Sequence, residues 1–167
     1  VYRARRLGES VDVAIKRLLA GSFATANARL RFERELEAVA ALQHENIVRA
    51  VDLGASDQHP VLVMEWIDGI PVDRWSDQTK SQTPRVIATL EVFLQICHAV
   101  HYAHQRGVIH RDLKPSNILV DSMARPHVLD FGLAKIVYSQ FDLATTVTGS
   151  SDFLGTPAYA APEQVRC

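Results

Sequence analysis

The sequence predicts an α+β domain of two lobes that are joined near residues 65–69. Three observations predict it. Strand-like stretches, the first of which alternates with period two, fill the first part of the chain around one helical segment. Asp68-Gly69 and then Pro71 break this pattern. A long helical segment, a short hairpin pattern and a polar loop follow the break.

The composition is close to that of an average globular domain. Of the 167 residues, 47% are hydrophobic and 22% are charged, which excludes a collagen-like, low-complexity or mostly disordered chain. The 18 Lys and Arg residues nearly balance the 19 Asp and Glu residues, so the net charge of −1 predicts no binding of nucleic acid. Polar residues interrupt every apolar stretch before it reaches membrane-spanning length, so we expect no membrane contact from this segment.

The cysteines and the first residues bear on location. Cys97 and Cys167 are too few for a disulfide framework, which favours a reducing compartment and predicts a cytoplasmic location. The chain opens without the pattern of a signal peptide. Its first residue is Val1 rather than Met, so we expect a fragment or a processed product of a parent protein whose anchoring is left open.

Four elements are expected in the first lobe. Residues 11–16 alternate with period two and predict a half-buried strand. Apolar residues at helical spacing predict a helix over residues 26–42. Two further strands are expected over residues 48–53 and 61–66, with turn residues at 57–60 between them.

A long helix is expected to open the second lobe. Thr83-Pro84 suits its start, because Thr caps helix N-termini and Pro fits the first helical position, and Gly107 marks its end. Cys97 is expected in the core, because it lies on an apolar stripe at helical spacing that contains Val86, Leu90, Phe93, Cys97, Val100 and His104. Residues 118–120 and 128–129 predict a small hairpin, and residues 138–153 an exposed loop.

The strongest chemical signal is the run His110-Arg111-Asp112-Leu113-Lys114-Pro115-Ser116-Asn117. Two motifs, Asp130-Phe131-Gly132 and Ala161-Pro162-Glu163, follow it, and Val13-Ala14-Ile15-Lys16 precedes it. Seven fixed positions in the first run would coincide by chance on the order of once in a billion starting points. On these motifs the sequence resembles the eukaryotic-type protein kinase family, and most closely its bacterial serine/threonine members around residues 102–107 and 160–164.

The resemblance implies a two-lobed, protein-kinase-like fold that is truncated. Residues 1–67 would form part of the N-terminal lobe, with its strands and helix C. Residues 68–167 would form part of the C-terminal lobe, with the catalytic loop and the activation segment. The activity implied is that of a non-specific serine/threonine protein kinase, which transfers the γ-phosphate of Mg·ATP to a Ser or Thr hydroxyl of a protein substrate.

The resemblance also assigns catalytic roles. Asp112 would act as the base toward the substrate hydroxyl, and Lys114 would neutralise charge on the transferred phosphoryl group. Asn117 and Asp130 would hold two Mg²⁺ ions, because a hard cation prefers oxygen ligands. Thr156 would hydrogen-bond the catalytic loop, and together with Lys114 it favours Ser or Thr over Tyr as the acceptor.

An ATP pocket follows from the same resemblance. Lys16 would reach the phosphates and pair with Glu35, whose alternative partner is Arg31 one turn back on the same helix. The adenine would lie among Val1, Ala14 and Leu119, against the backbone of Glu65 and Ile67 and in front of Met64.

The loop from Asp130 to Glu163 corresponds to an activation segment. Phosphorylation is expected at one or more of Thr145, Thr146 and Thr148, with Arg111 as the partner of the phosphate and autophosphorylation in trans as one source of it. An ordinary polar loop is the alternative.

Two other function classes stay open. A catalytically inactive kinase-fold fragment could serve as a binding or scaffold module, although the surviving catalytic positions argue against it. A small-molecule phosphotransferase of related fold would usually lack the Lys114-Pro115 pair. We expect the isolated fragment to be weakly active or inactive, because the glycine-rich loop and the later helices of the family lie outside this sequence.

Overall fold

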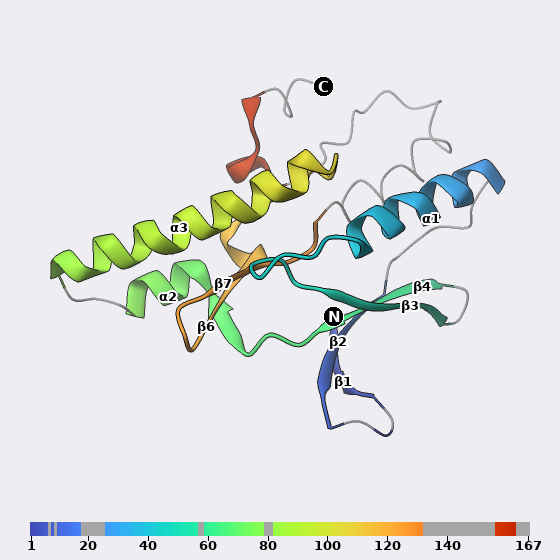
Figure 1. Cartoon of the computed structure of the whole chain (residues 1–167), viewed down its shortest axis with the longest axis horizontal. Helices are drawn as coiled ribbons and strands as arrows, with labels where there is room; N and C mark the ends of the chain where they lie inside the picture. The colour runs from blue at the N-terminus through green and yellow to red at the C-terminus, as the bar shows by residue number, and fades with distance from the viewer. Residues whose placement is uncertain are drawn as a thin grey trace.

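Two antiparallel sheets and three α-helices form the computed structural model of the chain, which describes residues 1–6, 8, 10–17, 26–56, 59–78, 82–131 and 156–162. The larger sheet has the order β1-β2-β4-β3, with β1 at Tyr2–Arg5, β2 at Asp12–Arg17, β3 at Ala50–Ser56 and β4 at His59–Glu65. The smaller sheet has the order β5-β6-β7, with β5 at Gly69–Pro71, β6 at Ile118–Asp121 and β7 at Pro126–Val128. The helices are α1 at Ala26–Ala40, α2 at Val72–Gln78 and α3 at Gln82–Gln105 (Figure 1).

The larger sheet confirms the predicted strands within a few residues and adds β1, which the sequence did not predict. Ala14 pairs with Met64, and Lys16 pairs with Leu62, so these four side chains share one face of the sheet. Leu36 of α1 packs on that face with Ala14, Leu62 and Met64. One side of α1 therefore covers the part of the sheet that carries Lys16.

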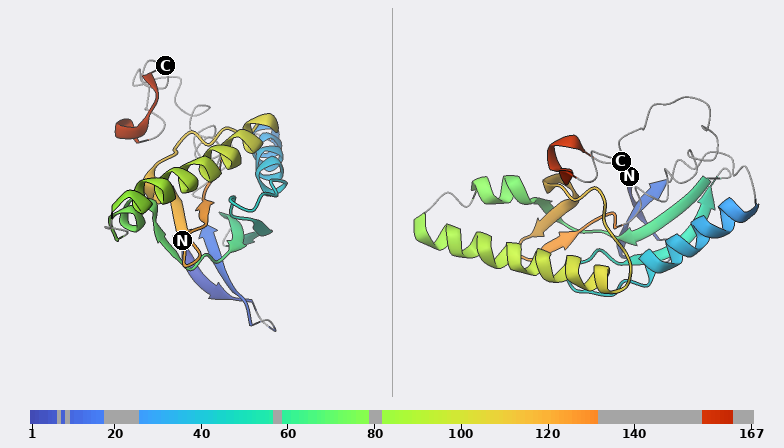
Figure 2. Two further views of the ribbon diagram at one scale, coloured as in Figure 1. Left: turned by 60° about the vertical axis from the view of Figure 1, so that its left-hand side comes forward. Right: turned by 90° about the horizontal axis from the view of Figure 1, so that it is seen from above.

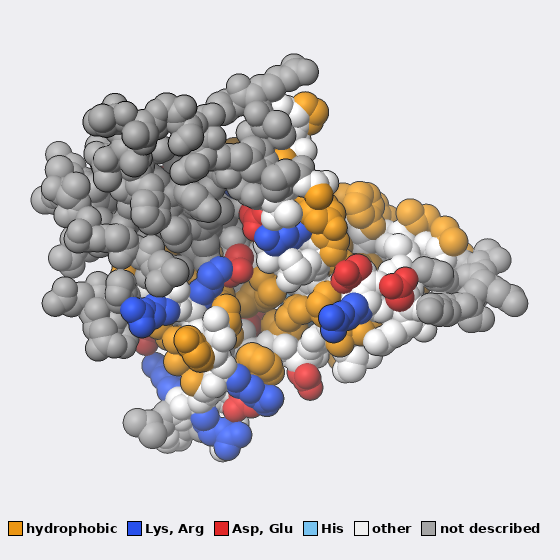
Figure 3. Space-filling model, turned by 180° about the vertical axis from the view of Figure 1, so that it is seen from behind, with side chains coloured by type: hydrophobic (Ala, Val, Ile, Leu, Met, Phe, Trp, Pro, Cys, Tyr) orange, Lys and Arg blue, Asp and Glu red, His pale blue; other side chains and the backbone are white. Residues whose placement is uncertain are grey.

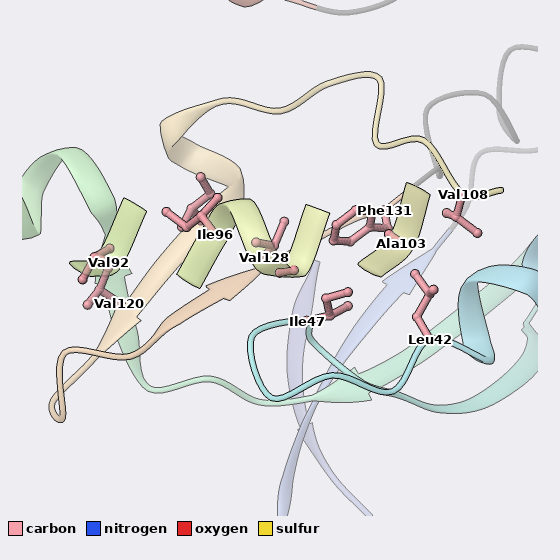
Figure 4. Packing of buried hydrophobic residues seen from close by; sticks show 11 residues of the cluster. Leu42, Ile47, Val92, Ile96, Ala103, Val108, Val120, Val128 and Phe131 are labelled. Atoms are coloured by element: carbon pink, nitrogen blue, oxygen red, sulfur yellow. The ribbon is translucent and has the colours of Figure 1, made fainter. Parts of the chain in front are cut away.

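The second core lies between α3 and the smaller sheet. Val92, Ile96, Ala99 and Ala103 of α3 are buried there, at helical spacing. Figure 4 shows Val92, Ile96 and Ala103 turned toward the side on which Val120, Val128 and Phe131 lie. Ala99 and Ala103 are fully buried, and such short side chains allow the helix to approach β7 closely.

The other side of α3 is exposed, and the expected core position of Cys97 is wrong. Apolar residues lie all around this helix, so the spacing of one stripe does not show which face is buried. The stripe that contains Val86, Leu90 and Phe93 is more than half exposed. Among the described helices, α3 alone is long and apolar enough, over Val86–Gln105, to cross a membrane by length and composition, although one side of it packs in the protein core.

A third strand of the smaller sheet and helix α2 stand where the sequence showed only a break. Gly69 begins β5 and pairs with Asp121. A Cβ atom at position 69 would lie 2.8 Å from the carbonyl oxygen of Val120, so this close strand pairing requires glycine. The views in Figure 2 show the strands of the smaller sheet lying between α2 and the larger sheet.

The segment between α1 and β3 joins the two sheets. Ile47 forms a parallel bridge with Val128. The N–H of Val48 donates to Val128 O at 3.0 Å, and the N–H of Val128 donates to Asn46 O at 2.8 Å. Asn46 is 3% exposed, and its side-chain Nδ2 donates to Pro126 O at 2.8 Å and to Gln95 Oε1 at 3.3 Å.

Replacing the Asn46 side chain should loosen this junction. Asn46→Ala leaves the Pro126 carbonyl without its buried donor, so we expect a loss of about 1–3 kcal/mol in the free energy of unfolding. Urea unfolding followed by circular dichroism measures it. Glu45→Ala, at the exposed neighbouring position, should change stability by less than about 0.5 kcal/mol, and equal losses in the two variants would contradict the assignment.

Asp121 organises the turn between β6 and β7. One carboxylate oxygen accepts the N–H groups of Met123 (2.8 Å) and Arg125 (3.0 Å). The other accepts the side chains of Arg125 (3.1 Å) and His127 (3.2 Å). Burial alone would raise the pKa of Asp121, but these hydrogen bonds outweigh it and lower the pKa to about 2.

This lowered pKa predicts a pH dependence of stability. A carboxyl group whose pKa is lower in the folded than in the unfolded state stabilises the fold above its unfolded value of 3.8, and the stabilisation is lost as the pH falls through about 2. Asp121→Asn should therefore be less stable than the parent chain above about pH 5, with the difference shrinking below about pH 4. Urea unfolding across this pH range measures it. A pH-independent difference would contradict the prediction, and exposed Asp73→Asn serves as the control.

Candidate active site

The segment from His110 to Asn117 forms a tight turn around the carboxylate of Asp112. It follows α3 after Gly107, whose φ of 75° ends the helix in the left-handed region that glycine favours. A single 3-10 turn at Pro115–Asn117 returns the chain to β6. Asn117 Nδ2 donates to Asp112 O at 2.8 Å and to Asp112 Oδ2 at 3.3 Å, which closes the turn on itself.

Asp112 is surrounded by donors. Lys114 Nζ lies 2.8 Å from Asp112 Oδ2, and the hydroxyl of Thr156 donates to Asp112 Oδ1 at 2.8 Å. Lys114 Nζ also donates to Thr156 Oγ1 at 2.8 Å. The expected hydrogen bond between Thr156 and the catalytic loop is therefore present, and it joins residues 44 positions apart.

These donors keep the carboxylate ionised. Burial alone would raise the pKa of Asp112, but the hydrogen bonds from Lys114, Thr156 and Asn117 together outweigh burial and lower the pKa below its usual value. At neutral pH, Asp112 is an anion beside a fixed cation. It can therefore accept a hydrogen bond, and then a proton, from a hydroxyl group placed next to it.

His110 connects Asp112 to the end of β7, a link that the sequence did not predict. Its Nε2 lies 2.8 Å from Leu129 O, and its Nδ1 lies 3.3 Å from the N–H of Asp112. Burial lowers the pKa of His110, so the ring is neutral at pH 7. These partners assign the proton to Nε2, which donates to Leu129, and leave Nδ1 to accept from Asp112. The ring also packs against Phe131 in a tilted arrangement, with centroids 4.9 Å apart and an interplanar angle of 58°. The one sequence signal for this role is that His110 directly follows the apolar pair Val108-Ile109.

Lys16 forms its ion pair with Asp130 and not with Glu35, which corrects the expected pairing. Lys16 Nζ lies 2.7 Å from Asp130 Oδ2, and the described residues show no ion pair between Lys16 and Glu35. The physical reason lies in the backbone of Asp130. Its φ is 60°, and its carboxylate lies beside the ammonium group of Lys16 on β2. The side chain of Arg31, the alternative partner of Glu35, lies outside the described residues.

The hydrogen bonding at the end of the smaller sheet brings the backbone of Asn117 next to Leu129, the residue before Asp130. The N–H of Leu129 donates to Asn117 O at 2.9 Å, which brings the ends of the two segments together. Donation from Nδ2 to Asp112 fixes the amide of Asn117, and its Oδ1 is then the atom left to accept or ligate. A carboxylate and an amide oxygen fit a hard cation such as Mg²⁺, which keeps several waters among its ligands. The described residues contain no cluster of three His, Cys, Asp or Glu side chains that could hold a metal ion.

The residues expected around the adenine differ widely in burial. Ala14 and Met64 are buried partners in β2 and β4. The Glu65 carboxylate accepts from Arg49 N at 2.8 Å, while Glu65 N donates to Arg49 O at 3.1 Å, so two hydrogen bonds join Glu65 to the backbone of Arg49. Ile67 and Leu119 are half-buried, and Val1 is 73% exposed.

A small apolar cavity lies behind Met64. It is lined by α1, the larger sheet and the end of β7, through Val39, Ile47, Val48, Ala50, Leu62, Met64, Val128, Asp130 and Phe131.

In Figure 3, acidic and basic side chains adjoin one another near the middle of the face, next to hydrophobic ones. Thr145, Thr146 and Thr148, together with Gly132 and Glu163, lie outside the described residues.

A two-lobed fold with one Lys–Asp pair across its lobes and a second within the turn at Asp112 has the architecture of a protein-kinase-like domain. All 167 residues match the family model described as the protein kinase domain, and the chain belongs to the protein kinase family.

Its relatives carry serine/threonine kinase names. The chain is 36% identical over 170 residues to the serine/threonine-protein kinase PknB of Mycobacterium tuberculosis, a match that covers 99% of this chain and 26% of PknB. It is 36% identical to the serine/threonine-protein kinase PrkC of Bacillus subtilis, with 99% and 24% covered. The crystal structure of the Mycobacterium tuberculosis PknI kinase domain superposes with a TM-score of 0.62 at 32% identity, and covers 80% of this chain and 54% of that one.

These comparisons confirm the predicted family, fold class and bacterial character. The chain spans about a quarter of the length of the curated relatives it matches and about half of the solved kinase domains. They support a serine/threonine protein kinase, and members of this family use ATP and Mg²⁺ and act on proteins.

Removing the hydroxyl of Thr156 should raise the pKa of Asp112. Thr156→Val deletes one of the donors that stabilise the charged carboxylate, whereas Thr156→Ser keeps it. Titration of the aspartate carboxyl carbons by NMR measures the shift, with the Asp112 resonance assigned from Asp112→Asn. Identical titration curves for the Val and Ser variants would contradict the arrangement.

Proposed function

We propose that this chain carries the catalytic centre of a serine/threonine protein kinase, which transfers the γ-phosphoryl group of ATP to a Ser or Thr hydroxyl of a protein. The observation that carries the proposal is the Asp112 cluster, in which one ionised carboxylate is held by Lys114, Thr156 and Asn117. The Asp112 carboxylate can orient the substrate hydroxyl while the ammonium group of Lys114 beside it faces the phosphoryl group.

The chain's residues divide the work of the transfer. Asp112 hydrogen-bonds the acceptor hydroxyl and takes its proton as that oxygen attacks the γ-phosphorus, while the bond from this phosphorus to the β–γ bridging oxygen breaks and ADP leaves. Lys114 neutralises charge on the phosphoryl group beside Asp112. Lys16 binds the phosphates of the nucleotide from β2, while Asn117 Oδ1 and the Asp130 carboxylate would hold Mg²⁺. When bound, Mg²⁺ supplies positive charge that compensates the phosphate oxygens.

The nucleotide would enter between the two lobes. We assign residues 1–67 to the N-terminal lobe and residues 68–167 to the C-terminal lobe, because β4 ends at Glu65 and β5 begins the smaller sheet at Gly69. Val1, Ala14 and Leu119 would enclose the adenine, and the backbone of Glu65 and Ile67 would hydrogen-bond it. Such a segment would work in the cytoplasm, where ATP is available.

Phosphorylation of the chain itself forms part of the proposal. Thr145, Thr146 and Thr148 follow the Asp130 segment and are the proposed acceptors, through transfer between two copies of the protein. A phosphate there could order its loop against Arg111. Mass spectrometry after incubation with Mg·ATP locates the phosphorylated residues. Phosphorylation of the Asp112→Asn variant at the same sites would show that another enzyme is responsible.

The central test combines binding and transfer. The chain is expected to bind Mg·ATP and to label a Ser/Thr peptide mixture at a low rate, in line with the weak activity expected of the fragment, and Asp112→Asn is expected to reduce that labelling by about 10²- to 10⁴-fold while binding remains. Lys16→Met should weaken both. Asp73→Asn, at an exposed position on α2, is the matched control and should change neither.

Other outcomes separate the alternative functions. Binding of Mg·ATP without labelling of any acceptor, in the parent chain as in Asp112→Asn, would favour a binding or scaffold module. Labelling of small alcohols or amines in preference to peptides would favour a small-molecule phosphotransferase. The absence of Mg·ATP binding would overturn the proposal.

A further inference from the structure

Arg3 of β1 lies on the face of the larger sheet that the nucleotide would use. β1 pairs with β2 in antiparallel register, and Arg3 is directly opposite Ala14. Directly opposed residues point to the same face of a sheet. Lys16 is two residues beyond Ala14 and shares that face. Arg3, Ala14 and Lys16 are therefore on one side of the sheet.

A carboxylate fixes the guanidinium of Arg3. Its Nε donates to Asp12 Oδ2 at 2.9 Å, and a terminal nitrogen contacts the same oxygen. Arg5, two residues along the strand, donates from Nε to Asp12 Oδ1 at 3.2 Å. Hydrogen bonds from Arg3 and then Arg5 lower the pKa of Asp12, so this carboxylate stays charged near neutral pH. In Figure 3, the lower edge of the molecule, where β1 and β2 lie, shows basic side chains around an acidic one.

The guanidinium also lies over an aromatic ring in the segment between the lobes. The Cζ atom of Arg3 is 4.8 Å from the ring centroid of Trp66, within the range of a cation–π contact. Trp66 packs against the core cluster of Ala14, Leu36, Leu62 and Met64. Its buried Nε1 has no hydrogen-bond partner among the described residues, so packing and this cation hold the ring.

We propose that Arg3 is a positioning residue for adenine binding, which acts by holding Trp66 and thereby the backbone on either side of it. Trp66 stands between Glu65 and Ile67, the residues whose backbone groups would meet the adenine. The inference rests on the proposed function, since it assumes a nucleotide at this edge. Arg3 need not touch the nucleotide for this role.

Arg3→Ala and Arg5→Ala form a matched pair for the test. Both variants remove an arginine of β1 that binds Asp12, but the cation over Trp66 belongs to Arg3. A partly exposed cation–π contact corresponds to about a two- to fivefold change in an equilibrium constant. We therefore expect Arg3→Ala to weaken Mg·ATP binding about two- to fivefold in isothermal titration, and Arg5→Ala to leave it unchanged.

Further readouts separate positioning from general stability. In phosphate transfer, Arg3→Ala should raise KM for ATP by the same factor and leave kcat unchanged. Combined with Trp66→Leu, it should weaken Mg·ATP binding no further than Trp66→Leu alone. Thermal unfolding of each variant confirms that it is folded at the assay temperature, and Arg3→Gln, which removes the charge but keeps a long polar side chain, replaces Arg3→Ala if it is not.

The outcomes distinguish this inference from the proposed function. Equal affinities for Mg·ATP in the parent chain and Arg3→Ala, or equal losses in Arg3→Ala and Arg5→Ala, would overturn the role of Arg3 and leave the proposed function standing. A parent chain that fails to bind Mg·ATP would overturn the proposed function, and the role of Arg3 with it.

Discussion

The pairing of residues 46–48 with β7 holds the two sheets together, and the position of the site depends on it. Two backbone hydrogen bonds and the buried amide of Asn46 attach the segment after α1 to Val128 and Pro126. Asp130 lies two residues beyond Val128 on the same short path. Movement at this junction would therefore be passed directly to the carboxylate that meets Lys16 across the lobes.

Charge balance explains why four ionisable groups can lie so close together. Asp112 and Asp130 each have a lysine within 2.8 Å, one from its own turn and one from the opposite sheet. Partly buried carboxylates without such partners would tend to take up protons. The two pairs differ in one respect: Lys114 is tied to Asp112 locally, whereas Lys16 depends on the packing of both lobes. The site thus contains one ion pair that forms within a single turn and one that forms only when both lobes are folded and packed together.

Much of the fold and of the site could be predicted from the sequence because the signals are local. A period-two pattern indicated β2, two further strand-like stretches indicated β3 and β4, and the motif around Asp112 indicated the catalytic loop and its hydrogen bond to Thr156. The misses have physical causes. β1 contains three arginine or tyrosine residues in four positions and lacks an apolar alternation. The buried side of α3 was misjudged because the helix is apolar on both sides, and the partner of Lys16 is decided by tertiary contacts and the backbone of Asp130.

The local character of the catalytic segment has a consequence for the order of folding. From Val108 to Phe131, the turn around Asp112, the β6–β7 hairpin and the link from His110 to Leu129 all join residues close in sequence. Such contacts close small loops at low entropic cost and can form early. The Lys16–Asp130 pair closes a loop that includes most of the chain, so we expect it among the last contacts to form. A nascent chain would then form its Asp112 turn before Lys16 reaches Asp130, and the complete site would form only when the two lobes pack together.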